Sequence, residues 1–529
     1  MRYINIIITA IVLSLSLGSC TGKFEDINTN PNKNTVGTVK AYNLFEPIFY
    51  SAGKWAVSVT YTYAGPISGQ FADTGHYTAT AYIHQWNLAE SNFQSLWDSP
   101  ARYGYDCQHM IDTAKEDGDT YYEALGYIFK VYHLANLASL FGEIPYREAY
   151  RGPSEGLKTP EFESQSDVFA NMCNELEYAV SLLQENPLPS RSGLDKMYND
   201  NCKSWIKFAN TLKIRLLNRI SNADPAAWNT IQTMLSNPED YPVFTSVKEQ
   251  ASIPFTGSDP YQSYFYTGNV TEDSFTSYKL SKKLVGMMHD SGTNYVDPRL
   301  YAFAQKESSD SWVGTVPGTA DSELKEANNK ATARLNNSVL NRNNAPSRLL
   351  EYSELMFIIA EGVQKGKLSM PQSAKYYYEE AVRASVTTWA DFVSYSNEPM
   401  IYDDETINNL LTKRLASYDA VATGTSPYGS ELELILSQKW ISLFWNGFEA
   451  YHEWRRNEYP IITIQSGTAV NDYEMPTRMQ YPMTVRTSNS ENMNEALQRM
   501  GGPNTMHTPL WWSYKACNGS SREEHVYKH

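Results

Sequence analysis

Three stretches of the sequence contain residue types that could hold a metal ion or catalyse a reaction, but none has the spacing that this chemistry needs. "HEWRR" (452–456) lacks the second histidine, four residues on, that a helical zinc site requires. "DINTN" (26–30) begins like a calcium-binding loop, yet Pro31 and Gly37 stand where that loop has Gly and Glu. The acidic residues 403–405 precede "TINNLL" and are predicted to cap a helix.

The sequence also lacks the short motifs that mark a catalytic nucleophile or a phosphate-binding loop. A pair of carboxylates for glycoside hydrolysis stays an alternative, because such pairs meet only in the folded chain. We therefore predict a protein that is not an enzyme and has no cofactor; no metal-ligating residues are singled out, and a structural metal ion is left open.

Aromatic residues in loops are the better candidates for function. The chain has 38 Tyr against 19 Phe, with 12 Trp. Their flat faces suit the C–H faces of a sugar ring, while Asp, Asn, Gln or Arg can bind its hydroxyl groups. Packing against the scaffold, or docking to a partner protein, is the alternative role of these loops. The candidate ligand-binding residues are Asp73, His76, Tyr77 and Trp86, then Tyr261, Tyr264 and Tyr266 beside Asp259 and Asn269, and finally Trp312.

The N-terminus is predicted to export the chain and to anchor it. Arg2 precedes an apolar run, 4–17, of signal-peptide length, which is too short to cross a bilayer. The residues "LGSC" that follow resemble the lipobox of bacterial lipoproteins, in which the cysteine is acylated. We predict a signal peptide at 1–19, lipidation of Cys20, and a lipidated tether at 20–40. The pairing of the other four cysteines is left open: Cys107, Cys173, Cys202 and Cys517.

Composition and charge narrow the class of protein further. Hydrophobic residues make up 42% of the chain and charged residues 19%, as in a soluble globular protein. The formal net charge of −15 argues against nucleic acid as a partner, because phosphate binding needs clustered Lys and Arg.

These candidate residues need a scaffold, and the hydrophobic pattern predicts a mainly helical one. We expect one large domain over 41–529, in which helices alternate with long irregular stretches. The pair 348–366 and 371–385 resembles a tetratricopeptide (TPR) unit. The helix at 204–220 is expected to bury one face and to carry Lys and Arg on the other. The other helices are predicted at 121–145, 168–183 and 431–445, and the irregular stretches at roughly 61–87, 245–278, 305–345 and 456–510.

The segment "NGFEAYHEWRRNEYP" is predicted to be structural. Three tryptophans in and before it, Trp440, Trp445 and Trp454, would pack the last helix pair. Glu449 would form a salt bridge with one of the arginines at 455–456.

Several segments together resemble the SusD/RagB family of nutrient-binding surface lipoproteins. They occur in family order across nearly the whole mature chain. One departure occurs where the family pattern is R-x-P-Y-P-x-x-E: the sequence reads "TRMQYPMTVRTSN", with Met479 and Val485 where more polar residues are expected. The resemblance rests on the lipobox with "FEDINTNPN", "LASLFGEIPYREA", "ELMFIIAEGVQKG" with "YYYEEAVRAS", "ILSQKWISLFWNGFEAYHEWRRNEYP" and "GGPNTMHTPLWW".

The resemblance implies an all-α, TPR-like fold with a loop-rich ligand-binding side. It also implies a lipoprotein of the outer membrane, on the cell surface, that captures oligosaccharide or polysaccharide. Such a protein would act as the lid of a SusC-like TonB-dependent transporter. Peptide capture is the alternative within the family, and a surface-anchored glycoside hydrolase is the alternative from another class.

Overall fold

The computed structural model describes residues 39–73, 82–267, 270–306, 311–316, 330–394, 402–462 and 474–522. Helices dominate these residues, as the sequence predicts. Within them, no helix combines the length and the apolar character needed to cross a membrane. Buried hydrophobic side chains from Phe45 to Trp512 form one contiguous cluster, so segments from both ends of the described chain share a core.

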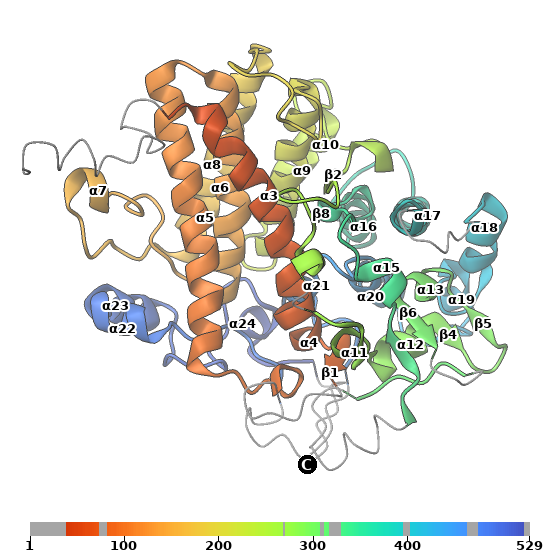
Figure 1. Ribbon diagram of the computed structural model, residues 1–529. Coiled ribbons are helices and arrows are strands. Elements are labelled where there is room, and N and C mark those ends of the chain that lie inside the picture. The colour runs from red at the N-terminus through yellow and green to blue at the C-terminus, as the bar shows by residue number, and fades with distance from the viewer. Residues whose placement is uncertain are drawn as a thin grey trace, which may run out of the picture.

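The scaffold consists of antiparallel helix pairs, which confirms the TPR-like architecture. The long helices α5, α6 and α8 stand side by side, and α3 lies across α5 and α6 (Figure 1). Between α5 and α6 the turn is short because Gly118 adopts a left-handed conformation and the Asp119 carboxylate caps α6 at the backbone of Tyr122. The pairs are α5 (Glu90–Asp117) with α6 (Thr120–Phe141), α8 (Gln165–Gln184) with α9 (Cys202–Ile220), α16 (Tyr352–Gln364) with α17 (Ala374–Ser394), and α20 (Glu431–Ser442) with α21 (Glu449–Asn457).

Helix α9 is buried on nearly every side, which corrects the expected exposed basic face. Arg215 forms a bidentate salt bridge with Glu354 of α16, and Arg219 forms a salt bridge with Glu449 of α21. These basic side chains can be buried because each meets a carboxylate from another helix. Glu449 therefore contacts α9 and does not form the predicted bridge within its own segment.

Arg456 of α21 holds the two C-terminal helix pairs together. Its guanidinium lies 2.6 Å from a carboxylate oxygen of Glu361 on α16 and 2.6 Å from one of Glu453, which also binds Lys439 of α20. Burial alone would raise the pKa of Glu361, but the charge of Arg456 outweighs it and holds this pKa well below its usual value. Arg455 donates instead to a backbone carbonyl.

Short strands connect the scaffold to its loops. The order in the four-stranded sheet is β1-β3-β7-β6, and all its pairs are antiparallel. Strand β8 takes up residues that were expected to begin the helix at 348, and it pairs with β2. The strands are β1 (Phe71–Asp73), β2 (Ala251–Ile253), β3 (Tyr278–Leu280), β4 (His289–Asp290), β5 (Tyr295–Val296), β6 (Ala304–Lys306), β7 (Ala333–Leu335) and β8 (Ser347–Leu350).

The remaining elements are shorter helices, apart from α3, and some lie where irregular chain was expected. Helices α22 and α23 lie within the predicted loop 456–510, and α22 packs against α5. The acidic stretch 403–405 caps α18 as predicted, because the Asp403 carboxylate accepts from the Thr406 backbone at 2.8 Å. These helices are α3 (Ala41–Val59), the π-helix η1 (Thr60–Ala64), α4 (Gly65–Ile67), η2 (Tyr82–Gln85), α7 (Gly152–Glu155), α10 (Ala226–Ser236), η3 (Val247–Glu249), η4 (Tyr264–Thr267), α11 (Glu272–Thr276), α12 (Lys282–Met288), α13 (Arg299–Phe303), α15 (Asn337–Leu340), α18 (Asp404–Thr412), α19 (Tyr418–Ala422), α22 (Met483–Ser488), α23 (Ser490–Arg499) and α24 (Tyr514–Asn518).

Candidate ligand-binding site

A small hollow lies where the chain leaves α3 and enters the four-stranded sheet. Helix α3 continues through the π-helix η1 into α4, and the chain then forms β1 near the lower edge of the view (Figure 1). The turn is tight because Gly65 has no side chain: a Cβ there would lie 2.0 Å from the ring of Phe71. The register of β1 with β3 then places Asp73 opposite Tyr278.

The lining of this hollow is mixed polar and aromatic. Its volume is about 200 Å³. Asn92 is held in place, since its amide oxygen accepts from the Ala89 backbone at 2.8 Å and its amide nitrogen lies 3.4 Å from the Tyr63 hydroxyl. The residues that line the hollow are Thr62, Pro66, Asp73, Ile83, His84, Asn92 and Tyr278.

The carboxylate of Asp73 sits among tyrosines. It is buried, and it accepts a hydrogen bond from the Ser277 hydroxyl at 3.0 Å. Burial raises the pKa of Tyr61 and of Tyr278, and the negative charge of Asp73 raises both further. Both phenols are therefore protonated at neutral pH and can donate hydrogen bonds.

Ring packing gives the tyrosines fixed positions. The rings of Tyr61 and Tyr278 lie 4.6 Å apart, and Tyr61 stacks on Phe275 at 5.5 Å with parallel planes. A hollow that combines one carboxylate, an amide and the fixed phenol of Tyr278 can bind a polyhydroxylated ligand by hydrogen bonds and ring contact. Among the residues that the structure describes, no group of three or more His, Cys, Asp or Glu could hold a metal ion.

Part of the predicted site gathers here. Asp73 lines the hollow, and Tyr264 lies close enough to Tyr61 and Tyr278 to raise the pKa of both. Tyr261 lies away from the lining and packs against Tyr50 of α3, with ring centres 4.5 Å apart. The predicted candidates His76 and Tyr77, the side chain of Tyr266, and the lipidation site Cys20 lie outside the residues that the structure describes.

The two tryptophan candidates are buried, as in the alternative in which these rings pack against the scaffold. Trp86 is fully buried, and its indole N–H donates to the carbonyl of Ile67 at 3.1 Å. Trp312 is only 7% exposed, because its ring packs edge-on against Tyr301 with the Lys306 amine over its face. In this structure both rings pack against the protein itself.

Sequence reasoning missed several lining residues. His84 lies within a stretch that was singled out, but it was not chosen. Thr62 and Asn92 sit on helices, and Tyr278 begins a strand of three residues that has no periodic signal. The pairing of β1 with β3, which no local pattern predicts, brings Tyr278 opposite Asp73.

The sequence matches the pattern of a known protein family. The family pattern described as "Starch-binding associating with outer membrane", SusD-like, matches residues 31–482, well over half of the chain. The chain belongs to the SusD-like family. This confirms the resemblance that the sequence motifs indicated. No curated protein matches the chain.

Several proteins of solved structure share the fold over nearly their whole length. A chitin-binding protein is 23% identical, with a TM-score of 0.72, 89% of this chain covered and 99% of that one. A SusD homologue from Bacteroides fragilis is 20% identical, with a TM-score of 0.70 and coverage of 90% and 100%. A SusD-like protein from Bacteroides thetaiotaomicron is 23% identical, with a TM-score of 0.68 and coverage of 91% and 100%. At these identities the likeness establishes the fold.

Proposed function

We propose that this protein is a lipid-anchored, cell-surface glycan-binding protein of the outer membrane. It captures oligosaccharides and passes them to a SusC-like TonB-dependent transporter, for which it acts as the lid. The observation that carries the proposal is the hollow beside β1, where Asp73, Asn92 and Tyr278 converge in a member of a family described as starch-binding.

The chemistry of the hollow supports a neutral sugar as the ligand. Asp73 can accept hydrogen bonds from two vicinal hydroxyl groups, and the Asn92 amide can donate one as well as accept one. The phenol of Tyr278 offers both a donor and a ring edge. These groups match a sugar, which presents hydroxyl groups around an apolar ring face.

Binding without catalysis is the proposed mode of action. Among the described residues that line the hollow, Asp73 is the one carboxylate. Hydrolysis of a glycosidic bond generally uses two carboxyl groups, one on each side of the bond. The bound sugar would therefore leave the hollow chemically unchanged.

The anchor and the transporter complete the proposal. Twenty residues separate Cys20 from the start of α3 at Ala41 (41 − 20 − 1). Fully extended, such a tether reaches at most about 70 Å. It would let the body swing over a barrel in the same membrane while the acyl chains stay in the lipid.

Titration calorimetry against a glycan panel tests the binding step. Starch, chitin, xylan and mannan oligosaccharides and a pool of short peptides would be titrated into the soluble protein, which starts after Cys20. Asp73→Asn removes a charge-assisted hydrogen bond worth roughly 1.5–3 kcal/mol, so we expect glycan affinity to fall about 10- to 100-fold. The exposed Asp240→Asn variant carries the same charge change and should bind normally.

Each other outcome has a distinct meaning. Binding of the peptide pool alone would favour the peptide-binding alternative, and release of shortened sugars would contradict the non-catalytic role.

Isolation of the full-length lipoprotein in detergent tests the partner, because a co-purifying TonB-dependent barrel is expected. Its absence would count against the lid.

A further inference from the structure

A second set of exposed aromatic groups lies along α5, away from the hollow beside β1. Trp97, Ala101, Tyr105 and His109 are spaced four residues apart, so successive members are neighbours at steps of about 6 Å along the helix, each turned about 40° from the one before. Trp97 is half-buried, Tyr105 is 42% exposed and His109 is exposed. Asn92, which lines the hollow, is five residues before Trp97 and therefore points about 140° away around the helix.

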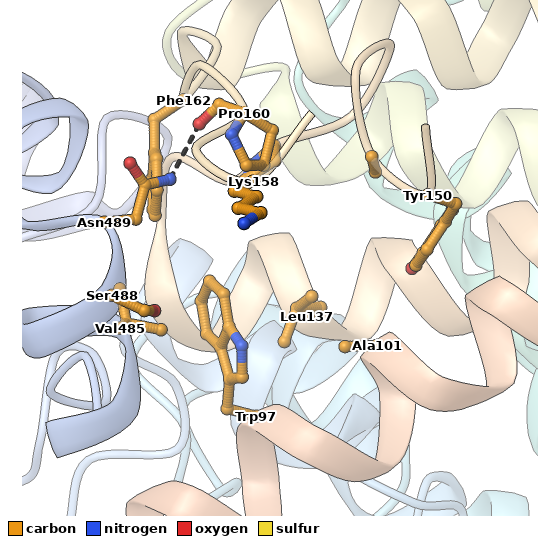
Figure 2. Close-up of a pocket in the computed structure, with 12 residues that line it drawn as sticks. Trp97, Ala101, Leu137, Tyr150, Lys158, Pro160, Phe162, Val485, Ser488 and Asn489 are labelled. Carbon is orange, nitrogen blue, oxygen red and sulfur yellow. Dashed lines mark hydrogen bonds between the residues drawn. The ribbon is translucent and has the colours of Figure 1, made fainter. Parts of the chain in front are cut away.

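A pocket opens on this face where Ala101 leaves room between two rings. Figure 2 shows the indole of Trp97 and the ring of Tyr150 on either side of Ala101 and Leu137. The cavity measures about 220 Å³. At about 30 Å³ for each water molecule this volume equals that of roughly seven waters, which is enough for one monosaccharide unit. The lining is mostly apolar, with Lys158, Ser488 and Asn489 as its polar groups.

The pocket is already formed in the absence of a ligand. Trp97 is held by the Phe162 ring, which stacks on it at 6.2 Å, and by the edge-on rings of Phe141 and Tyr481. Tyr150 lies close across α5 because Gly104 has no side chain: a Cβ there would be 2.3 Å from the Tyr150 hydroxyl.

The walls are also joined to one another across three segments. Asn489 at the end of α22 donates to the carbonyl of Pro160 at 2.8 Å, as Figure 2 shows. The Thr484 hydroxyl of the same helix donates to the Gln94 side chain of α5 at 2.9 Å. Val485, one of the two departures from the family pattern, lines the pocket and keeps this wall apolar.

The indole shares the pocket with a cation. Lys158 and Trp97 both line the pocket, and Figure 2 shows them next to each other in this view. Lys158 forms no hydrogen bond or ion pair with the residues that the structure describes, so this donor is available to a ligand. An aromatic side chain and an available cationic donor that line one cavity of this size can contact a sugar ring and bind its hydroxyl groups.

We propose that this face of α5 is a second oligosaccharide-binding site. One sugar unit occupies the pocket between Trp97 and Lys158, and the following units extend along Tyr105 and His109. This site rests on the proposed function in one respect, which is that the protein's ligands are glycans.

An extended peptide fits this face less well. Each of its residues presents a backbone donor and a backbone acceptor that need partners. The backbone groups of α5 are already paired within the helix, and the face offers rings at intervals of about 6 Å. A linear oligosaccharide needs no such backbone partners.

The test measures the number of binding sites and the effect of variants at each. The soluble protein would be titrated with maltoheptaose and with chitohexaose. Ala101→Leu fills the pocket without removing a packed ring, and Tyr105→Ala shortens the track. Each should weaken binding at the α5 face about tenfold or more, whereas Tyr376→Ala, which removes a similarly exposed ring from α17, should not.

The two sites give separable results. Two sites in the native protein, one lost in Ala101→Leu and the other in Asp73→Asn, is the expected outcome. A single site that is lost in Asp73→Asn and unchanged in Ala101→Leu would overturn this inference and leave the proposed function standing. A single site lost only in Ala101→Leu would keep the inference and remove the hollow from the proposed function. Failure to bind either sugar would count against both.

Discussion

Replacement of Glu361 by Gln tests the buried ion pairs that hold the scaffold in shape. The Glu361 carboxylate is fully buried and receives two hydrogen bonds from Arg456, at 2.6 and 2.7 Å. Removing its charge leaves the Arg456 guanidinium buried with less compensation, and such a change typically costs about 3–5 kcal/mol. The unfolding entropy of a body of this size is roughly 1 kcal/mol per kelvin, so the Tm should fall by about 3–5 °C.

A surface pair provides the matched control. Asp419 also accepts two hydrogen bonds from one cation, Lys375, but its side chain is 72% exposed. Asp419→Asn should cost at most about 1 kcal/mol and shift the Tm by about 1 °C or less. Thermal unfolding of the three proteins followed by circular dichroism at pH 7 gives both values. Equal shifts for the two variants would refute the argument that burial sets the cost.

The same carboxylate predicts how stability depends on pH. Arg456 holds the pKa of Glu361 below its ordinary value of 4.5 in the folded state, although burial acts in the opposite direction. The unfolded chain therefore binds this proton at a higher pH than the folded chain does. The contribution is fully present above pH 4.5 and is lost as the pH falls below it. In Glu361→Gln this part of the acid sensitivity should disappear.

Three further predictions concern single positions. Gly65→Ala should lower the free energy of unfolding by at least about 1–3 kcal/mol, because the Cβ of the new alanine would meet the Phe71 ring. Chemical denaturation measures this change, and a variant as stable as the native protein would contradict the packing described for β1. Iodoacetamide followed by peptide mass spectrometry should label the exposed Cys517 and spare Cys107, whose burial raises its pKa; rapid labelling of Cys107 would disprove that burial. Asp403→Ala should cost about 1 kcal/mol through loss of the α18 cap, and an unchanged Tm would show that the cap contributes little.

The helical scaffold could be predicted because its signal is local. The apolar face of 168–183 repeats every three or four residues, and in α8 its members are all buried, as predicted. The pair 348–366 and 371–385 was also found, although its first residues became strand β8. Trp440, Trp445 and Trp454 pack in the core as expected.

The partners of buried charges could not be predicted. The predicted bridge for Glu449 lay within its own helix, but the structure pairs it with Arg219, 230 residues away in sequence. The two residues meet because α9 and α21 pack together, and no spacing within one segment reports that contact.

The candidate site was only partly predictable for a similar reason. Residue type singled out Asp73, a carboxylate among loop aromatics, and the structure places it in the lining of the hollow. Residue type also favoured Trp312, yet a polar flanking sequence does not exclude that a neighbouring ring such as Tyr301 covers it. The position of Tyr278 in the hollow could not be predicted, because it is set by the pairing of β3 with β1.

A crystal structure of the soluble protein with a bound oligosaccharide from the calorimetric panel tests the central claim most directly. We expect a sugar in the hollow beside β1, with hydroxyl groups within hydrogen-bond distance of the Asp73 carboxylate and the Asn92 amide. An empty hollow in crystals that hold the sugar only elsewhere on the protein would contradict the account.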